Sequence, residues 1–412
     1  MVKRNEKNSE KRRYKIKTGS ITTPKGFAAA GIHAGLKEST PDLALIKSDC
    51  PATVAAVFTT NTLKAAPILF SQKIIRNKEA QAIVINSGVA NACTGQQGLN
   101  DCEEMAALTA KGLDIDAGQV LIASTGVIGE YLPMPLLRSG IERACRNLSP
   151  ENGAKAAQAI LTTDTKPKHK AVAFRLQENN CTIGAISKGS GMIQPNMATM
   201  ISILTTDVAI SADLLQKALY QAVNVSYNRL TIDGEMSTND CVFCLANGLS
   251  GNRIINKENQ AYDVFLDALN AICLDQTRKL AADGEGATKS ISVTVTNART
   301  TGQAEQAARA VANSQLVKTA IYGEDPNWGR VISAIGSTGV DIRPDKLDIW
   351  FADIPVAREG AAVPYDTKKL KAALKKKDIK IHASLGTGTE KATIYTCDLT
   401  HKYIEINAEY HT

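Results

Sequence analysis

The sequence predicts a mixed α/β fold, and three observations lead to this prediction. Short apolar runs typical of strands alternate with longer amphipathic stretches that have the period of a helix. Their spacing does not follow the regular β-α-β repeat that would force a doubly wound sheet. Strand-like runs after residue 347 surround a lysine-rich helix. We therefore expect a larger mixed body followed by a smaller C-terminal α+β unit.

The first half of the chain is predicted to contain several strands and three helices. Residues 16–31 have the composition of an extended segment and a turn. Apolar runs predict strands at 42–60, 81–86, 119–124, 171–177 and 182–187. Amphipathic spacing predicts helices at 101–113, 134–147 and 151–161. The helix at 101–113 is expected to carry acidic residues in its first turn, where the helix macrodipole stabilises them.

The second half is predicted in the same way. Strands are expected at 200–204, 242–246, 291–296, 347–352, 379–385 and 392–398. Helices are expected at 212–225, 260–281, 303–319 and 368–377. The sequence DPNWGR at 325–330 predicts a turn.

Composition and charge exclude some classes of protein. The chain has 412 residues, of which 44% are hydrophobic and 22% charged, as in ordinary globular proteins of two or three domains. Residues 1–17 hold eight basic and two acidic residues and so contribute +6 of the net charge of +7. We interpret them as a basic, disordered tail and predict no nucleic-acid partner. The apolar stretches are too short for a signal peptide or a membrane span, so we predict a cytoplasmic protein without a membrane partner.

The cysteines and histidines do not predict a metal site. Nine cysteines lie scattered along the chain, which favours reduced thiols over disulfides. Cys241 and Cys244 form a CxxC pair, which could serve redox or metal chemistry, but its apolar surroundings favour buried structural thiols. The five histidines form no ligand pair. We expect no bound metal.

The segment 188–207, KGSGMIQPNMATMISILTTD, holds the residues that point most directly to chemistry. Glycines and a proline predict an irregular turn that leads into an apolar strand. At the junction, Ala198 precedes Thr199. Attack of the Thr199 hydroxyl on the Ala198 carbonyl, followed by hydrolysis, would leave Thr199 as a new N-terminus. Its α-amine would titrate near ~8 and serve as general base for the hydroxyl. Local sequence alone favours a simple turn before a strand.

The sequence KGSGMIQPNMATM resembles the self-cleavage segment of the ornithine acetyltransferase family, the glutamate N-acetyltransferases of arginine biosynthesis. Similarity runs from PKGFAAAGIHAGLK at 24–37 to CDLTHKYIEINAEYHT at 397–412. The resemblance implies a layered main domain at 18–283 and a smaller domain at 284–412 whose last residues return to the active site. It also implies cleavage into an α chain, 1–198, and a β chain, 199–412, that stay associated, with a heterotetramer of two α and two β chains.

The same resemblance assigns roles to particular residues. Thr199 is implied to be the nucleophile, and Thr125 with Gly126, in STGVIGEYLPM, the oxyanion hole. Losing one such donor typically lowers kcat ~10²–10³-fold. The residues implied to bind substrate are Thr162, Lys188, Thr199, Glu285, Asn407 and Thr412. Lys188 offers a charge for a carboxylate and Glu285 a countercharge for an amine, although either type of residue alone is usually a surface charge. Residues 406–412 are expected to be ordered.

The reaction that the resemblance implies is ping-pong. Thr199 takes the acetyl group from N-acetylornithine and passes it to glutamate, which requires a pocket closed to water. Some members of the family also accept acetyl-CoA as donor. We expect no bound cofactor, with acetyl-CoA at most a co-substrate, because GTGTE at 386–390 lacks the lysine of a phosphate-binding loop.

The sequence differs from the family pattern at four positions, Val89, Glu235, Met236 and Gln315. None of these four is expected at the nucleophile, the oxyanion hole or the pocket.

Two other classes of function remain open for this sequence. One is an N-terminal-threonine amidohydrolase, which would use the same nucleophile but give its acyl group to water. The other is a non-catalytic binding protein on the same scaffold.

Overall fold

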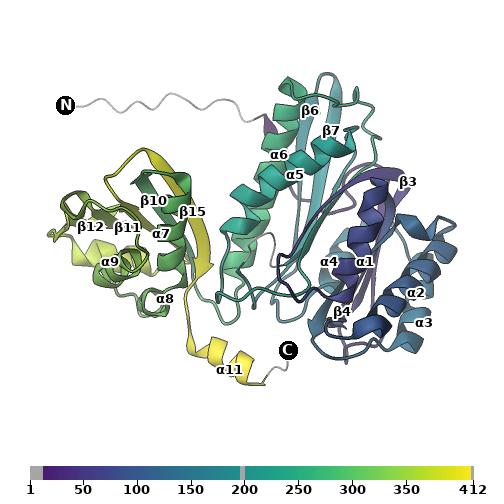
Figure 1. The fold of residues 1–412 in the computed structure, drawn as a ribbon, viewed down its shortest axis with the longest axis horizontal. Coiled ribbons are helices and arrows are strands. Elements are labelled where there is room, and N and C mark those ends of the chain that lie inside the picture. Colours follow the sequence, from purple (N-terminus) through teal and green to yellow (C-terminus); the bar gives the residue numbers. More distant parts are fainter. Residues whose placement is uncertain (1–12, 195–199, 410–412) are drawn as a thin grey trace.

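The computed structural model describes residues 13–194 and 200–409, which build two β-sheets with helices packed against them (Figure 1). The strands of the first sheet are β1 (Tyr14–Lys17), β2 (Phe27–Ile32), β3 (Leu43–Phe58), β4 (Glu79–Val89), β5 (Val120–Val127), β6 (Lys168–Leu176), β7 (Asn179–Lys188), β8 (Ile201–Thr206) and β9 (Cys241–Ala246). Its helices are α1 (Ala66–Ile74), α2 (Gly95–Leu113), α3 (Met134–Arg146), α4 (Gly153–Ala159), α5 (Ala212–Val225) and α6 (Gln260–Ala282).

The order of the strands in the first sheet is β1-β6-β7-β8-β9-β3-β4-β5, with β2 paired to β3. The long strand β3 pairs with β2 through its first half and with β9 through its second half. Strand β8 pairs antiparallel with β7 and parallel with β9. Both β8 and β9 therefore lie inside the sheet, between strands that come from the first half of the chain.

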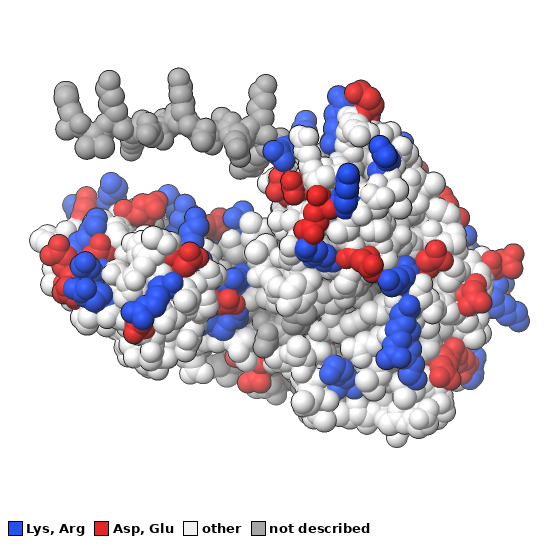
Figure 2. Space-filling view, turned by 45° about the horizontal axis from the view of Figure 1, so that its top comes forward, with Lys and Arg blue, Asp and Glu red and all other residues white. Residues whose placement is uncertain are grey.

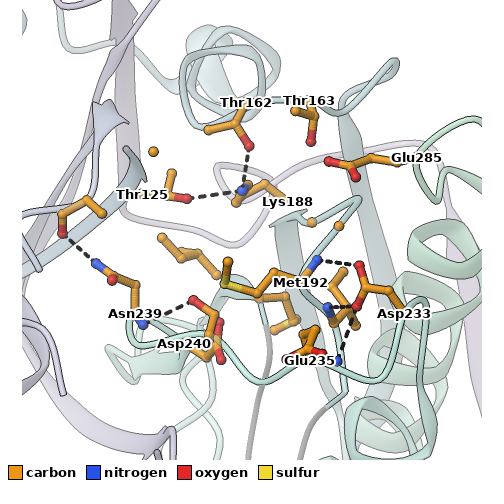
Figure 3. Close-up of a pocket in the computed structure, with 18 of the residues that line it drawn as sticks. Thr125, Thr162, Thr163, Lys188, Met192, Asp233, Glu235, Asn239, Asp240 and Glu285 are labelled. Carbon is orange, nitrogen blue, oxygen red and sulfur yellow. Dashed lines mark hydrogen bonds between the residues drawn. The ribbon is translucent and has the colours of Figure 1, made fainter. Parts of the chain in front are cut away.

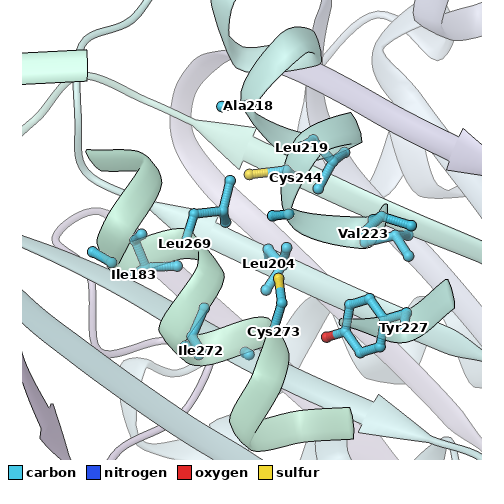
Figure 4. Packing of buried hydrophobic residues seen from close by; sticks show 14 of the residues in the cluster. Ile183, Leu204, Ala218, Leu219, Val223, Tyr227, Cys244, Leu269, Ile272 and Cys273 are labelled. Atoms are coloured by element: carbon cyan, nitrogen blue, oxygen red, sulfur yellow. The ribbon is translucent and has the colours of Figure 1, made fainter. Parts of the chain in front are cut away.

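The two faces of this sheet are covered by different helices. Side chains of β7, β8 and β9 pack against α5 and α6 in a buried cluster that includes Leu204, Leu219 and Leu269 (Figure 4). The Tyr227 hydroxyl lies in this cluster at 2.8 Å from the Ser202 hydroxyl, so its polar atom is satisfied. On the other face α4 packs against β2 and β3. These layers confirm the predicted mixed α/β class.

The second sheet has the order β13-β12-β11-β14-β10-β15. Its strands are β10 (Ser290–Ala298), β11 (Asp348–Phe351), β12 (Ile354–Arg358), β13 (Ala361–Ala362), β14 (Asp378–Ser384) and β15 (Glu390–Cys397). The helices of this part are α7 (Thr301–Asn313), α8 (Gln315–Tyr322), α9 (Trp328–Gly336) and α10 (Thr367–Leu374), and they share one core with the sheet. A last helix, α11 (His401–Glu409), leaves this unit and extends toward the first sheet (Figure 1).

Several predicted elements differ from the structure near their ends. Helix α2 begins at Gly95 and has no acidic residue in its first turn, so the predicted start at 101 and the dipole argument are wrong. The predicted helix 303–319 is two helices that meet at Ser314, whose hydroxyl accepts a hydrogen bond from Val317 N and caps α8. The predicted turn at 325–330 contains the start of α9, which Asn327 caps.

The predicted disordered tail is wrong for residues 14–17, which form β1 and pair antiparallel with β6. Residues 1–12 lie outside the described residues. Elsewhere on the surface, Lys and Arg are interspersed with Asp and Glu on the face drawn in Figure 2, as expected for a body whose charge is near neutral. Among the described residues, no helix is both long enough and apolar enough to span a membrane.

Candidate active site

A cavity of about 170 Å³ lies where β7 ends and β8 begins, close to the end of β5 (Figure 3). Its volume limits a ligand to a small molecule. Residues of the first sheet and its loops, of the segment between α6 and β10, and of α11 surround it. Its polar lining residues include Thr125, Thr162, Thr163, Lys188, Asp233, Glu235, Ser237, Asn239, Asp240, Glu285, Tyr403 and Asn407.

Lys188, the last residue of β7, is the main cationic group of the cavity and is only 9% exposed. Its ammonium donates hydrogen bonds to Thr162 Oγ1 at 2.8 Å and to Thr125 Oγ1 at 3.1 Å. Because an ammonium group only donates, both hydroxyls accept here and keep their own protons for other partners. Burial lowers the pKa of Lys188. Among the described residues, two of its three N–H groups have hydrogen-bond partners.

The end of β5 places Thr125 and Gly126 beside this lysine. Gly126 pairs with Gly88 of β4, and its φ of +133° lies in the region that favours glycine. A Cβ at position 126 would come within 2.2 Å of the Gly88 carbonyl carbon. Only glycine therefore allows β4 and β5 to approach this closely next to the Thr125 hydroxyl.

A buried ionic cluster of Lys168, Asp164 and Asp283 lies next to the segment that carries Lys188. Lys168 Nζ lies 2.6 Å from Asp164 Oδ1 and 2.5 Å from Asp283 Oδ2, and the Lys168 side chain is 2% exposed. Asp164 also accepts a hydrogen bond from Gly189 N at 2.7 Å, directly after Lys188. Burial acts to raise the pKa of Asp164, but the ammonium groups of Lys168 and Lys188 outweigh it and hold that pKa below its usual value. The cluster fixes the backbone on which Lys188 sits.

The opposite wall of the cavity carries Glu285 and Asn407. Asn407 Nδ2, from α11, donates to Glu285 Oε2 at 2.8 Å. A Cβ at Gly191 would lie 2.4 Å from the Glu285 carboxyl group, so glycine is required for this approach. The final helix thus brings a residue from near the C-terminus to the same cavity as the end of β7.

The loop before β9 closes the remaining side. Asp233 accepts hydrogen bonds from Met192 N at 2.7 Å and Ile193 N at 2.8 Å, which fixes the chain after Gly191. Asn239 Nδ2 donates to the backbone carbonyls of Ala90 and Ser124, at 2.6 and 2.9 Å, and so ties the loop to the ends of β4 and β5. These contacts join parts of the chain that are far apart in the sequence.

The structure brings together most of the residues that the sequence predicted. Those around the cavity are Thr125, Gly126, Thr162, Lys188, Glu285 and Asn407. Ala198, Thr199 and Thr412 lie outside the described residues, while Met200, next to Thr199 in the chain, lines the cavity. Of the expected ordered segment 406–412, residues up to 409 belong to α11 and residues 410–412 lie outside the described residues. The roles of all these residues stay predictions.

Sequence reasoning missed other lining residues, notably Asp233, Asn239, Asp240 and Tyr403. From the sequence we also expected none of the four positions that differ from the family pattern to lie in the pocket. This expectation is wrong for Glu235, which lines the cavity. The only signal for most of this set was the concentration of polar residues in TIDGEMSTND at 231–240.

Neither cysteine of the CxxC pair lines the cavity, although Cys241 directly follows Asp240 in the chain. Cys241 and Cys244 are fully buried in β9, and burial raises the pKa of both thiols. Within residues 13–194 and 200–409, no group of three or more His, Cys, Asp or Glu side chains is arranged to hold a metal ion.

Comparison with known proteins identifies the chain's relatives. The model of the ArgJ family matches residues 28–412. The chain is 47% identical over 397 residues to the arginine biosynthesis bifunctional protein ArgJ of Symbiobacterium thermophilum, which covers 96% of this chain and 99% of that protein.

Solved structures are similar as well. The crystal structure of the arginine biosynthesis bifunctional protein ArgJ from Bacillus halodurans is 39% identical, with a TM-score of 0.50, and covers 52% of this chain and 100% of its own. The ornithine acetyltransferase of Mycobacterium tuberculosis, solved in complex with ornithine, is 38% identical, with a TM-score of 0.42, and covers 45% of this chain and 100% of its own.

The site and these relatives define the chain as an enzyme of the acyltransferase class. Since the family model matches nearly the whole chain, the chain belongs to the ArgJ family.

Proposed function

We propose that this enzyme is a glutamate N-acetyltransferase of arginine biosynthesis, which moves the acetyl group of N-acetylornithine to glutamate through an acetyl ester on Thr199. The pathway is supported by the similar Symbiobacterium thermophilum protein, which is an arginine biosynthesis bifunctional protein. The observation that carries the proposed chemistry is the cavity itself. It lies beside Met200, one residue after the proposed nucleophile, and contains a buried lysine with two threonine hydroxyls.

Each half-reaction passes through a tetrahedral intermediate whose oxygen becomes negatively charged. The Thr125 hydroxyl accepts from Lys188, so its own proton is free to be donated to that oxygen, and the backbone N–H of Gly126 is the proposed second donor. The third N–H of Lys188 is available for the carboxylate that N-acetylornithine and glutamate share. Glu285 is the proposed countercharge for a substrate amine, and the C-terminal residue, Thr412, contributes to substrate binding in the proposal.

The proposal includes self-cleavage between Ala198 and Thr199, which creates the N-terminal amine that acts as base. The length of the solved Bacillus halodurans chain supports it. That chain aligns over its whole length with 52% of this one. Cleavage would leave a second piece of 214 residues, residues 199–412, which is 52% of the 412 residues.

The sheet explains how the two pieces would stay associated after cleavage. Strands β8 and β9 belong to the second piece, yet they pair with β7 and β3 of the first piece. Both strands are buried over their full length. Separating the pieces would therefore expose the centre of a sheet, which hydrophobic burial opposes. We further propose a cytoplasmic enzyme with two α and two β chains, and acetyl-CoA as a second donor.

Electrophoresis under denaturing conditions and a transfer assay test the proposal together. Wild type should give pieces of 198 and 214 residues, and Thr199→Ala should stay one chain. Purified protein should form N-acetylglutamate from N-acetylornithine and glutamate, and acetyl-CoA in place of N-acetylornithine tests the second donor. Release of acetate without transfer would instead identify an amidohydrolase. An intact chain in fully active wild type would contradict the N-terminal-amine mechanism.

A further inference from the structure

Asp240 lies directly before β9 and lines the cavity next to the start of β8 (Figure 3). Strands β8 and β9 pair in parallel from Ile201 and Cys241 onward, and Cys241 N donates to Met200 O at 3.0 Å. Paired strands lie about 4.8 Å apart. Asp240 and Met200, which follows the proposed nucleophile in the chain, therefore lie close together in the cavity lining.

The Asp240 carboxyl group is hydrogen-bonded to Ser237, but it differs from the carboxyl groups of Asp233 and Glu285 in its second oxygen. It is only 3% exposed, and within the described parts of the chain its Oδ2 is buried without a hydrogen-bond partner. Asp233, by contrast, accepts from backbone N–H groups, and Glu285 accepts from Asn407. A buried acceptor without a partner costs about 1–3 kcal/mol, so one that faces a cavity calls for an explanation.

The surroundings of Asp240 favour its neutral form. Burial raises its pKa well above the usual value, and hydrogen bonds with the Ser237 side chain and backbone, together with the Lys188 ammonium at the end of β7, only partly oppose this. Other titratable groups near it are the Cys241 thiol, next in the chain, and the carboxyl groups that share the cavity, Asp233, Glu235 and Glu285. Thr59, directly after β3, contacts only the backbone of this residue, through a hydrogen bond from its N–H to the Asp240 carbonyl. A protonated carboxyl group inside an acyl-transfer site can deliver a proton.

We propose that Asp240 carries the proton that the leaving nitrogen requires during acyl transfer. This inference rests on the proposed function. As the bond between Thr199 Oγ1 and the acetyl carbon forms, the bond from that carbon to the donor's nitrogen breaks. The nitrogen takes the Asp240 proton, and the hydroxyl proton goes to the N-terminal amine. The Asp240 carboxylate then recovers a proton from that ammonium group, and attack by the glutamate amine runs the same transfers in reverse.

The test is the rate at which N-acetylornithine acetylates Thr199 in a single turnover, followed by mass spectrometry from about pH 6 to about pH 9. Asp240→Asn keeps the volume of the side chain and removes the acidic proton. It should slow acetylation ~10²–10⁴-fold, the usual contribution of a general acid. It should also abolish the decline of the wild-type rate at high pH, where Asp240 loses its proton. Asp240→Glu should recover at least part of the rate.

Asp207→Asn is the matched control. Asp207 is also buried, at 2% exposure, burial also raises its pKa, and it lies at the other end of β8 with Thr182 N and Lys25 N as donors. Its variant should keep the wild-type rate and pH profile. If Asp240→Asn does not cleave itself before Thr199, the test uses a second measurement. The quantity measured is then the rate at which Asp240→Glu cleaves itself, because cleavage also releases a nitrogen that needs a proton. A folded Asp240→Glu that stays uncut would then overturn the inference.

The outcomes separate this inference from the proposed function. If wild type never carries an acetyl group on Thr199, the proposed function fails and the inference fails with it. If wild type is acetylated and Asp240→Asn is acetylated at the same rate with the same pH profile, only the role of Asp240 is overturned.

Discussion

Replacing Lys188 by methionine removes the buried ammonium but keeps most of the side chain's volume. Within the described parts of the chain this group has two hydroxyl partners, Thr125 at 3.1 Å and Thr162 at 2.8 Å, and its third N–H is the proposed donor to a substrate carboxylate. A hydrogen bond to a charged group contributes about 1.5–3 kcal/mol. Since about 1.4 kcal/mol corresponds to tenfold in binding, losing the carboxylate contact should raise KM roughly 10- to 150-fold.

The fold should survive this change. Burial lowers the pKa of Lys188 although the Asp164 carboxylate acts to raise it, so the desolvation of the ammonium outweighs this attraction. Methionine should therefore leave the free energy of unfolding within about 1 kcal/mol of wild type. Steady-state kinetics for N-acetylornithine and glutamate, with urea unfolding alongside, check both parts. Lys217→Met, which removes an exposed lysine paired with Glu258, is the matched control and should change neither quantity. A KM within twofold of wild type in folded Lys188→Met would refute the assignment of Lys188 to substrate binding.

Three further substitutions test other parts of the site. Lys168→Met removes the ammonium that two buried carboxylates share and should lower the free energy of unfolding by about 3–5 kcal/mol in urea titrations. A loss below about 1 kcal/mol would contradict the role of the ionic cluster. Gly191→Ala places a methyl group 2.4 Å from the Glu285 carboxyl group and should lower kcat/KM at least tenfold. Gly336→Ala, which has nothing within 4 Å of the added carbon, is the control and should leave kcat/KM unchanged. Equal kcat/KM values for the two variants would contradict a role of Glu285 in the site. Burial raises the pKa of Asp240 above 3.8, so the folded wild type binds more protons than the unfolded chain above that pH and loses stability as pH rises. The urea midpoint of Asp240→Asn should therefore exceed that of wild type by a margin that grows between about pH 4 and about pH 8, and a constant margin would show that Asp240 does not titrate in this way.

Local sequence predicted the central strands because burial on both faces leaves an apolar signature. The predicted strand 182–187 lies within β7, and 242–246 lies within β9. Helix ends were harder to predict, because capping depends on single side chains such as Ser314, which divides an alanine-rich stretch into two helices. Helix α1 was missed, since Pro67 in its first turn suppresses the helical signal although proline is well tolerated there.

The site was predicted only in part, for a related reason. Resemblance to a family identified Lys188 and Glu285, whereas periodicity carries no information on which loops meet in space. Asp240 reaches the cavity because β9, which follows it, pairs with β8. Tyr403 reaches the cavity because it lies on α11. Both depend on long-range packing, which the order of residues along the chain does not reveal.

The most direct test of the central claim is the mass of the peptide that begins at Thr199, measured after purified protein is mixed with N-acetylornithine without glutamate. We predict that this peptide gains the mass of one acetyl group and loses it when glutamate is added, with N-acetylglutamate formed in equal amount. If N-acetylglutamate forms while the peptide never carries the acetyl group, the proposed mechanism is contradicted.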